Sequence, residues 1–254
     1  MDGRPATIVA MTPSGERWRA LQRAAWLSVA MHFIAGLAML LVLGEGLESN
    51  EDQTARLRFL VERRAAWTAG WLAWHAAALS MLWFAVCFAR ACREVAEHEG
   101  GGGLPAFAVA LIAAAIALDL GAQAIELGLT PKLADEVLAA EVSGDEAART
   151  EAGRAFHRTH RAAMLLTGYA ANGLYTIASL ALAWSGRRRY PVWASAAALL
   201  VGGSGMALSA AVLADFVPGM VWSNVVLLPA LLLWQAGVAL AAGKFYREAE
   251  RPPR

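Results

Sequence analysis

Six long blocks of apolar residues divide this chain, and they limit the folds that it can adopt. Each block has about the 20 mostly apolar residues that an α-helix needs to cross a bilayer. The blocks cover residues 24–44, 66–89, 105–127, 161–184, 192–214 and 220–243. None alternates like a barrel strand, and lipid offers the backbone no hydrogen bonds, so helices are required. The sequence therefore predicts an all-α polytopic membrane protein, a six-transmembrane-helix bundle in a single domain over residues 1–254.

The composition agrees with a membrane environment. Apolar residues make up 58% of the chain and charged residues 17%, against roughly 45–50% and about 25% in soluble domains. The lipid bilayer is therefore the expected partner, and no nucleic acid is expected.

Two of the connections between the blocks are expected to be helical. Residues 54–64 carry apolar positions at helical spacing, and residues 129–160 read as two short polar helices, the second started by Ser143 or Asp145. Both are assigned to the exoplasmic side. The glycine run at residues 100–103 is expected to form a flexible joint between two halves of the bundle.

Charge gives the expected orientation. With a cytoplasmic N-terminus, thirteen Lys and Arg residues fall on the cytoplasmic side against seven acidic residues. Short basic connections such as residues 187–189 orient a membrane protein more strongly than long loops do. Both termini are therefore predicted to be cytoplasmic. Cys87 and Cys92 then lie at the reducing side and are expected to stay unpaired.

Ionisable residues inside a membrane helix are costly and by default mark function. Asp119, Gln123 and Glu126 follow each other at helical spacing, so they share one face of the third block. Asp119 lies about 13 Å from the exoplasmic end, whereas Glu126 is expected near the interface, in contact with water. Asp119 is read either as a proton or cation relay or substrate anchor, or as a structural hydrogen bond between helices.

His75 in the second block has the same depth as Asp119, so the two are predicted to lie within reach of each other or of a shared water. Trp71 and Trp74 precede His75 and are read as the wall of an apolar pocket or as an interfacial belt. Other polar residues reach a similar depth. The predicted cluster comprises His75, Asp119, Gln123, Tyr169, Asn172 and Ser204.

Two further sets of polar residues are candidates. His32 and Gln235 match in depth nearer the cytoplasm, where a single interhelical hydrogen bond is expected. His157 and His160 are spaced so that they could share a metal ion. Because arginines interleave with them and no third ligand is evident, they are predicted to form a solvated basic helix end, and no metal is expected.

The last third of the chain contains a recurring set of residues, Leu174, Tyr175, Arg189, Pro191, Trp193 and Gly202. In these residues it resembles a family of uncharacterised bacterial six-helix membrane proteins of unknown function. It implies six helices and a bacterial inner membrane, and it implies no activity.

Three classes of function follow from these features. The first is a small-molecule or proton-linked carrier or binding protein with a polar site in the outer half of the bundle. The second is a scaffold subunit of a larger membrane complex. The third is an intramembrane haem or metal enzyme, which is disfavoured because His32 and His75 differ by about 9 Å in depth. No cofactor is expected, and a homo-oligomer is left open.

Overall fold

The structure, a computed structural model, describes residues 15–98 and 103–250, with side chains left undescribed over 93–98. Within these ranges it contains helices and no strands. Six helices there are long and apolar enough to cross a membrane. The predicted all-α six-helix membrane fold is therefore confirmed.

The helices follow the predicted blocks and extend beyond most of them. Their bounds are α1 Gly15–Leu41, η1 Leu43–Glu45, α2 Gln53–Glu62, α3 Arg64–His98, α4 Leu104–Gly128, α5 Thr130–Ser143, α6 Glu146–Met164, η2 Leu165–Ala171, α7 Asn172–Gly186, α8 Val192–Leu213 and α9 Val217–Ala249. The fourth span is composite, because the end of α6, the π-helical η2 and α7 form it together.

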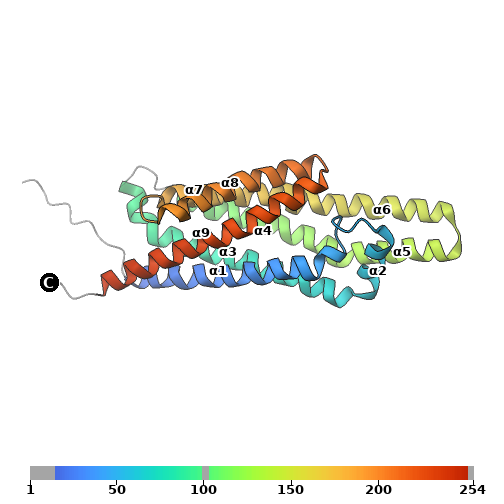
Figure 1. Ribbon diagram of the computed structural model, residues 1–254, viewed down its shortest axis with the longest axis horizontal. Coiled ribbons are helices and arrows are strands. Elements are labelled where there is room, and N and C mark those ends of the chain that lie inside the picture. Colours follow the sequence, from blue (N-terminus) through green and yellow to red (C-terminus); the bar gives the residue numbers. More distant parts are fainter. Residues whose placement is uncertain (1–14, 99–102, 251–254) are drawn as a thin grey trace, which may run out of the picture.

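The spans lie side by side in one bundle (Figure 1), with α1 against α3 and α9, α4 against α3 and α7, and α8 against α9. The beginning of α1 and the end of α9 lie at one end, which we call the base. At the other end α2, α5 and α6 lie together. We call the segments 43–63 and 130–160 the cap.

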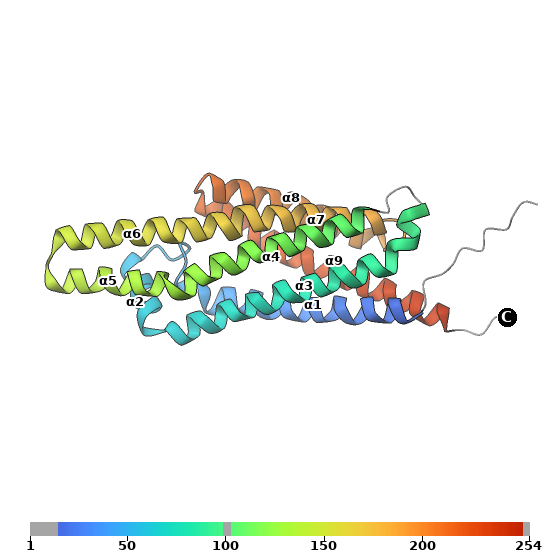
Figure 2. The ribbon, with the colours of Figure 1, turned by 180° about the vertical axis from the view of Figure 1, so that it is seen from behind.

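A long helical hairpin dominates the cap. The helical stretch from Leu104 to Ser143 holds 40 residues, which corresponds to about 60 Å of helix, twice the hydrocarbon thickness of about 30 Å. Figure 2 shows that α5 and the first part of α6 project beyond the other spans. The predicted pair of polar helices is confirmed, and the Asp145 carboxylate starts the second by accepting from the Ala148 N–H at 3.0 Å.

Two hydrophobic cores support this arrangement. The core of the bundle contains Phe84, Phe88 and Trp234 at its centre. The cap has a core of its own, in which Leu60 of α2 and Phe156 of α6 lie with Trp67 of α3. Large apolar side chains such as Leu40, Leu79 and Leu199 stay exposed on the outside of the spans, where a bilayer would cover them.

Small residues let α7 and α8 approach each other closely. A Cβ atom at Gly205 would lie 2.1 Å from Thr176 Oγ1, and one at Gly202 would lie 2.6 Å from Leu180. Gly203, one position away on α8, has open space around it. The glycines that face α7 therefore set the distance between these two spans.

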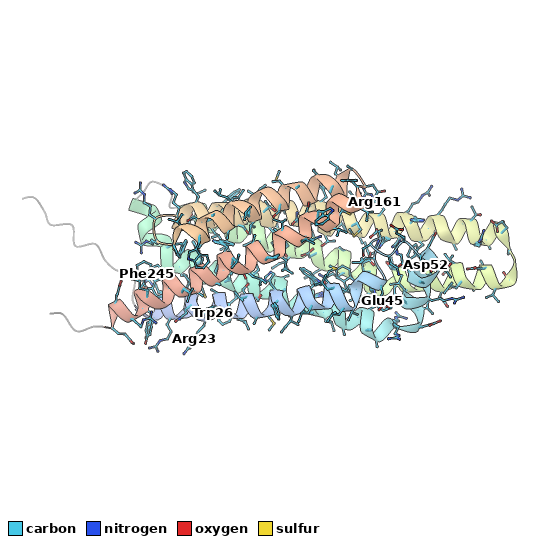
Figure 3. The ribbon with its side chains drawn as sticks, viewed as in Figure 1. Arg23, Trp26, Glu45, Asp52, Arg161 and Phe245 are labelled. Atoms are coloured by element: carbon cyan, nitrogen blue, oxygen red, sulfur yellow. The ribbon has the colours of Figure 1, made fainter. Side chains whose placement is uncertain are left out.

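Charged side chains gather where the bundle meets the cap. Figure 3 shows Glu45, Asp52 and Arg161 toward that end and Arg23, Trp26 and Phe245 toward the base. Arg161 pairs with Asp215 at 3.1 Å and donates to the Leu213 carbonyl at 3.1 Å, which ties α6 to the turn between α8 and α9. Most of the predicted glycine joint, residues 100–102, lies outside the described residues, and Gly103 precedes α4.

Candidate functional site

Asp119 lies inside the bundle on α4 and is held by two hydroxyl groups of the composite fourth span. Asp119 is 9% exposed. Thr167 donates to one carboxyl oxygen at 2.5 Å, and Tyr175 donates to the other at 3.0 Å. Among the described residues no Lys or Arg forms an ion pair with Asp119. The side-chain hydrogen bonds to Asp119 therefore come from two neutral hydroxyl groups.

The π-helical segment η2 positions Thr167. Here the Asn172 N–H reaches back to the Thr167 carbonyl, five residues earlier, which widens the helix by one residue per turn. Gly168 in the same segment faces α8, where a Cβ atom would lie 2.8 Å from Val212. Thr167 within this segment and Tyr175 in the following α7 helix bond the two oxygens of one carboxyl group. Segments of this kind occur often at functional sites.

His75 lies at the level of Asp119, as the depth match predicted, but no hydrogen bond joins the two among those that the structure shows. The half-buried imidazole contacts the Trp71 carbonyl through Nδ1 at 3.2 Å. It is close enough to Asp119 to interact with it electrostatically. His75 is therefore a neighbour of the site and can influence its charge.

The remaining members of the predicted cluster are divided among different places. Asn172 donates to the Gly205 carbonyl at 2.7 Å and to Ser209 at 2.9 Å, so it joins α7 to α8. Ser204 bonds the Leu200 carbonyl of its own helix. The Tyr169 side chain is 44% exposed on the outside. Depth alone did not show which helix faces meet, and none of these three residues forms a hydrogen bond with Asp119 among those that the structure shows.

Gln123 of α4 and two tryptophans of α3 carry buried polar atoms without a partner. Gln123 is 2% exposed, and its Oε1 has no hydrogen-bond partner within the protein. The indole N–H groups of Trp71 and Trp74 are also buried without a partner. Trp71 belongs to the cap core and Trp74 packs against it.

His32 and Gln235 are both buried, but each has a partner other than the one that depth predicted. His32 Nδ1 contacts the Ser28 carbonyl at 2.8 Å on its own helix. Gln235 donates to the Met81 sulfur at 3.3 Å. Among the hydrogen bonds that the structure shows, none joins His32 to Gln235.

A second charged group lies where the cap meets the bundle, and it corrects two predictions. Glu126 is 1% exposed rather than wet, and His160 is 3% exposed rather than part of a solvated helix end. The His160 imidazole contacts Glu126 through Nδ1 at 2.7 Å and Glu48 through Nε2 at 2.5 Å. The α5–α6 hairpin and α2 cover these groups. The residues next to Glu126 and His160 in the sequence did not predict that burial.

Glu48 and Arg56 complete this group from the segment before and within α2. Burial would raise the pKa of Glu48, but the contact with the charged His160 imidazole outweighs burial and lowers that pKa from 4.5 to about 2. Burial lowers the pKa of Arg56, while the charges of Glu48 and Glu126 oppose that shift. Two acidic and two basic side chains thus neutralise one another in a buried place. We call Glu48, Arg56, Glu126 and His160 the cap charge cluster.

The two candidate metal ligands, His157 and His160, lie in different surroundings. His157 is exposed and His160 is buried. Within the described residues no group of three or more His, Cys, Asp or Glu side chains could hold a metal ion. The two carboxylates contact opposite nitrogens of His160, so they do not converge on one point. Cys87 and Cys92 are free and buried.

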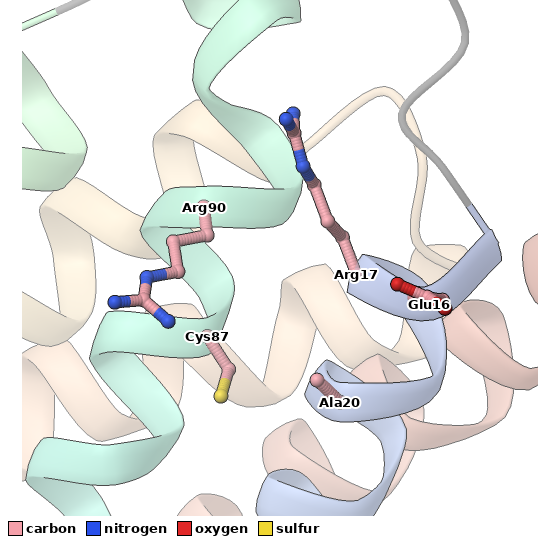
Figure 4. A pocket seen from close by; sticks show the side chains of 5 residues that line it. All are labelled: Glu16, Arg17, Ala20, Cys87 and Arg90. Carbon is pink, nitrogen blue, oxygen red and sulfur yellow. The ribbon is translucent and has the colours of Figure 1, made fainter.

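A hollow of about 160 Å³ lies near the base, between α1 and α3. Figure 4 shows the residues that line it, which are Glu16, Arg17 and Ala20 on α1 and Cys87 and Arg90 on α3. It is far along the bundle from Asp119, because Cys87 and His75 are twelve residues apart on α3, or about 18 Å. The hollow therefore does not belong to the Asp119 site.

Sequence reasoning missed the residues that hold the two carboxyl groups. Thr167 and Tyr175 lie on the fourth span at a spacing of about two helical turns, which could have shown that they share a face. Glu48 and Arg56 lie in a connection outside the spans, and no local pattern connects them with His160.

Comparison with protein-family models, with curated proteins and with solved structures finds no match.

Proposed function

We propose that this membrane protein is a proton-linked carrier of small molecules, in which Asp119 binds and releases the proton. One observation carries the proposal. Asp119 is buried in a membrane span and is held by Thr167 and Tyr175, with no Lys or Arg ion pair among the described residues.

The cost of that arrangement supports a functional role. A charged side chain at the centre of a membrane helix costs about 2.5–3.5 kcal/mol on insertion scales. A proton on Asp119 removes this charge, and both hydroxyl groups can still bond the neutral acid, because hydroxyls donate and accept. Both forms of Asp119 thus have partners at this site, which suits a group that changes its protonation state.

The neighbouring π-helical segment gives the proton a way to act on the fold. Thr167 lies in η2 and Tyr175 lies in α7, so a change at Asp119 changes the bonds on both sides of Asn172. A π-helical turn is a rare interruption of an α-helix that often lies at a functional site. Protonation of Asp119 would therefore bias the packing of η2 against α8, as a carrier that alternates between two states requires.

The cellular setting belongs to the same proposal. The short basic connections lie at the base, so the positive-inside rule favours a cytoplasmic base and an exoplasmic cap. The resemblance of the last third to uncharacterised bacterial proteins supports the inner membrane of a bacterium as its location.

Infrared spectroscopy of the purified protein in lipid tests the proposal. A pH step should produce a difference band from the C=O stretch of a protonated carboxyl group in an apolar setting. Asp119→Asn should remove this band. Asp135→Asn is the matched control, because Asp135 is an exposed carboxylate on α5, and it should leave the band unchanged. A difference spectrum of Asp119→Asn identical to that of the unchanged protein would overturn the proposal.

A scaffold role is the second candidate, and the projecting α5–α6 hairpin favours it. A scaffold would keep its assembly when Asp119 is replaced by Asn, and it would lose that assembly when the exposed hairpin tip is altered. Val142 at the hairpin tip is 89% exposed, so Val142→Asp alters that surface. Native mass spectrometry of the complex extracted from the membrane, applied to Asp119→Asn and to Val142→Asp, separates the two roles.

A further inference from the structure

The hollow near the base lies where the spans meet the membrane surface. The first apolar block begins at residue 24 and the second ends at residue 89. The charged residues that line the hollow, Glu16, Arg17 and Arg90, therefore lie just outside these blocks, at the level of the lipid headgroups. A cavity of about 150 Å³ holds a benzene-sized molecule. The hollow, at about 160 Å³, thus has room for a group of the size of a phosphate.

The surroundings of the hollow become apolar toward the membrane. Cys87 belongs to the core of the bundle, and Ala20 packs against that core. Trp83 lies one turn further into the membrane than Cys87 on α3 and is 46% exposed, and Trp26 on α1 is 43% exposed. Exposed tryptophans at this level are typical of contact with lipid near the interface. A molecule in the hollow would therefore have charged groups on its water side and apolar groups on its membrane side.

The charges that line the hollow favour an anion. Arg17 and Arg90 are positive and Glu16 is negative, which leaves one positive charge in excess. Arg90 is exposed, and among the described residues the structure shows no ion pair for it. Arg19, also at the base, is instead held within the protein by Glu250 at 3.0 Å. The Arg90 guanidinium is thus available to a group from outside the protein.

We propose that the hollow binds the phosphate group of an anionic phospholipid, whose acyl chains lie beside Trp26 and Trp83. A guanidinium can bind a phosphate through two parallel hydrogen bonds. Basic pockets between membrane helices are suited to acidic headgroups when they face the cytoplasm, which agrees with the orientation proposed for the base. Arg17 and Arg90 come from different helices (Figure 4), so a bound lipid would link α1 to α3 at the base.

Two features of the lining narrow the choice of ligand. The Glu16 carboxylate accepts hydrogen bonds, which suits a headgroup that carries hydroxyl groups beside its phosphate. A free phosphate ion shares the chemistry that the arginines recognise, but it has no acyl chain to cover Trp26 and Trp83. Phosphatidylglycerol has the phosphate, the hydroxyl groups and the acyl chains, and it is therefore the probe of choice.

Native mass spectrometry of the full chain in micelles, titrated with phosphatidylglycerol or with phosphatidylcholine, tests the proposal. The unchanged protein should retain phosphatidylglycerol more tightly than phosphatidylcholine. Arg90→Gln should weaken phosphatidylglycerol binding about fivefold, because a basic residue near an anionic lipid contributes about that factor. Arg247→Gln is the matched control. Arg247 is exposed near the end of α9 and does not line the hollow, so this variant should bind like the unchanged protein.

The space and the charge of the hollow can be tested separately. Ala20→Leu fills part of the hollow and keeps both arginines, so it should also weaken phosphatidylglycerol binding. Arg90→Lys keeps the positive charge and should bind more tightly than Arg90→Gln. Thermal unfolding in lipid-free micelles should give all of these variants the midpoint of the Arg247→Gln control, which separates loss of binding from loss of the fold.

Equal retention of the two lipids, or phosphatidylglycerol binding unchanged in Arg90→Gln, would overturn the proposal. Displacement of phosphatidylglycerol by inorganic phosphate at equal concentration would overturn it as well, because the hollow would then take a free ion rather than a lipid. None of these results depends on Asp119, since the hollow is not part of that site. The lipid site and the proton-linked function can therefore fail independently.

Discussion

Asp119 and Glu126 are two buried carboxyl groups on one helix that differ in what compensates their charge. Glu126 faces an imidazole, which in turn contacts Glu48. Asp119 faces two hydroxyl groups that serve the charged and the neutral form alike. A paired charge is suited to holding a structure together, whereas an unpaired carboxyl group is suited to gaining and losing a proton.

The hydroxyl groups on Asp119 should be visible in its vibrational spectrum. Tyr175→Phe removes one hydrogen bond, which should move the C=O stretch of protonated Asp119 to higher frequency and cost about 1 kcal/mol of stability. Tyr169→Phe is the control, because the Tyr169 side chain points outward two residues after Thr167. A shift of equal size in both variants would contradict the contact between Tyr175 and Asp119.

The cap charge cluster should make stability depend on acid pH. The pKa of Glu48 is lowered from 4.5 to about 2 in the folded protein. Its contribution to the free energy of unfolding, up to about 3 kcal/mol, is therefore complete above pH 4.5 and is lost as the pH falls toward 2. Thermal unfolding of the protein in micelles, followed from neutral to acid pH, measures this loss.

Replacement of Glu48 by Gln should lower the unfolding temperature at neutral pH and flatten its dependence between pH 4.5 and 2. Glu51→Gln, at an exposed carboxylate in the same segment, should behave like the unchanged protein. An equally steep acid dependence in Glu48→Gln would show that Glu48 is not the group responsible.

At the scale of elements, the composite fourth span is the part that the site depends on most. The α6 helix joins the cap to the bundle through His160 and Arg161, η2 supplies Thr167, and α7 supplies Tyr175 and Asn172. Glycines on the facing α8 helix allow this irregular span to pack closely. A disturbance of the contact between α7 and α8 should therefore reach the Asp119 site.

The spacing of α7 and α8 can be tested with two neighbouring glycines. In Gly205→Ala the new Cβ atom would meet Thr176 Oγ1 at 2.1 Å, so the variant should lose about 1–3 kcal/mol of stability. Gly203→Ala places its Cβ atom in open space and should be neutral or slightly stabilising. Thermal unfolding in micelles compares the two, and equal midpoints would contradict the observed packing.

The sequence predicted the spans well because each one needs a long apolar block, which is a local property. It also singled out Asp119, which the structure buries inside the bundle. It could not show that Tyr169 points outward while Tyr175 points inward, since the π-helical turn changes the angle between successive side chains. Nor could it predict the contact between Glu48 and His160, because that contact depends on how the cap folds over the bundle.

At the scale of the whole molecule, the structure separates a membrane bundle from a cap with its own core and its own charged cluster. The cap places about 20 Å of the α5–α6 hairpin beyond the spans. The η2 segment bonds Asp119 through Thr167 and continues from α6 of the cap. A proton at Asp119 therefore has a physical connection to the cap through the fourth span.

The orientation of this arrangement is testable in intact cells. Ser143 is exposed at the hairpin tip, and a membrane-impermeant maleimide should label Ser143→Cys in cells that carry it. Arg188→Cys, at the base, should be labelled only after the cells are opened. Labelling of Arg188→Cys but not Ser143→Cys in intact cells would reverse the proposed orientation.

The central claim is that Asp119 binds a proton within the membrane, and a pH jump on protein adsorbed to a solid-supported membrane tests it most directly. Movement of a proton to a site inside the bilayer displaces charge, so the unchanged protein should give a transient current that protein-free membranes lack. Asp135→Asn should keep that current and Asp119→Asn should abolish it. A current of undiminished size in Asp119→Asn, or none in the unchanged protein, would contradict the claim.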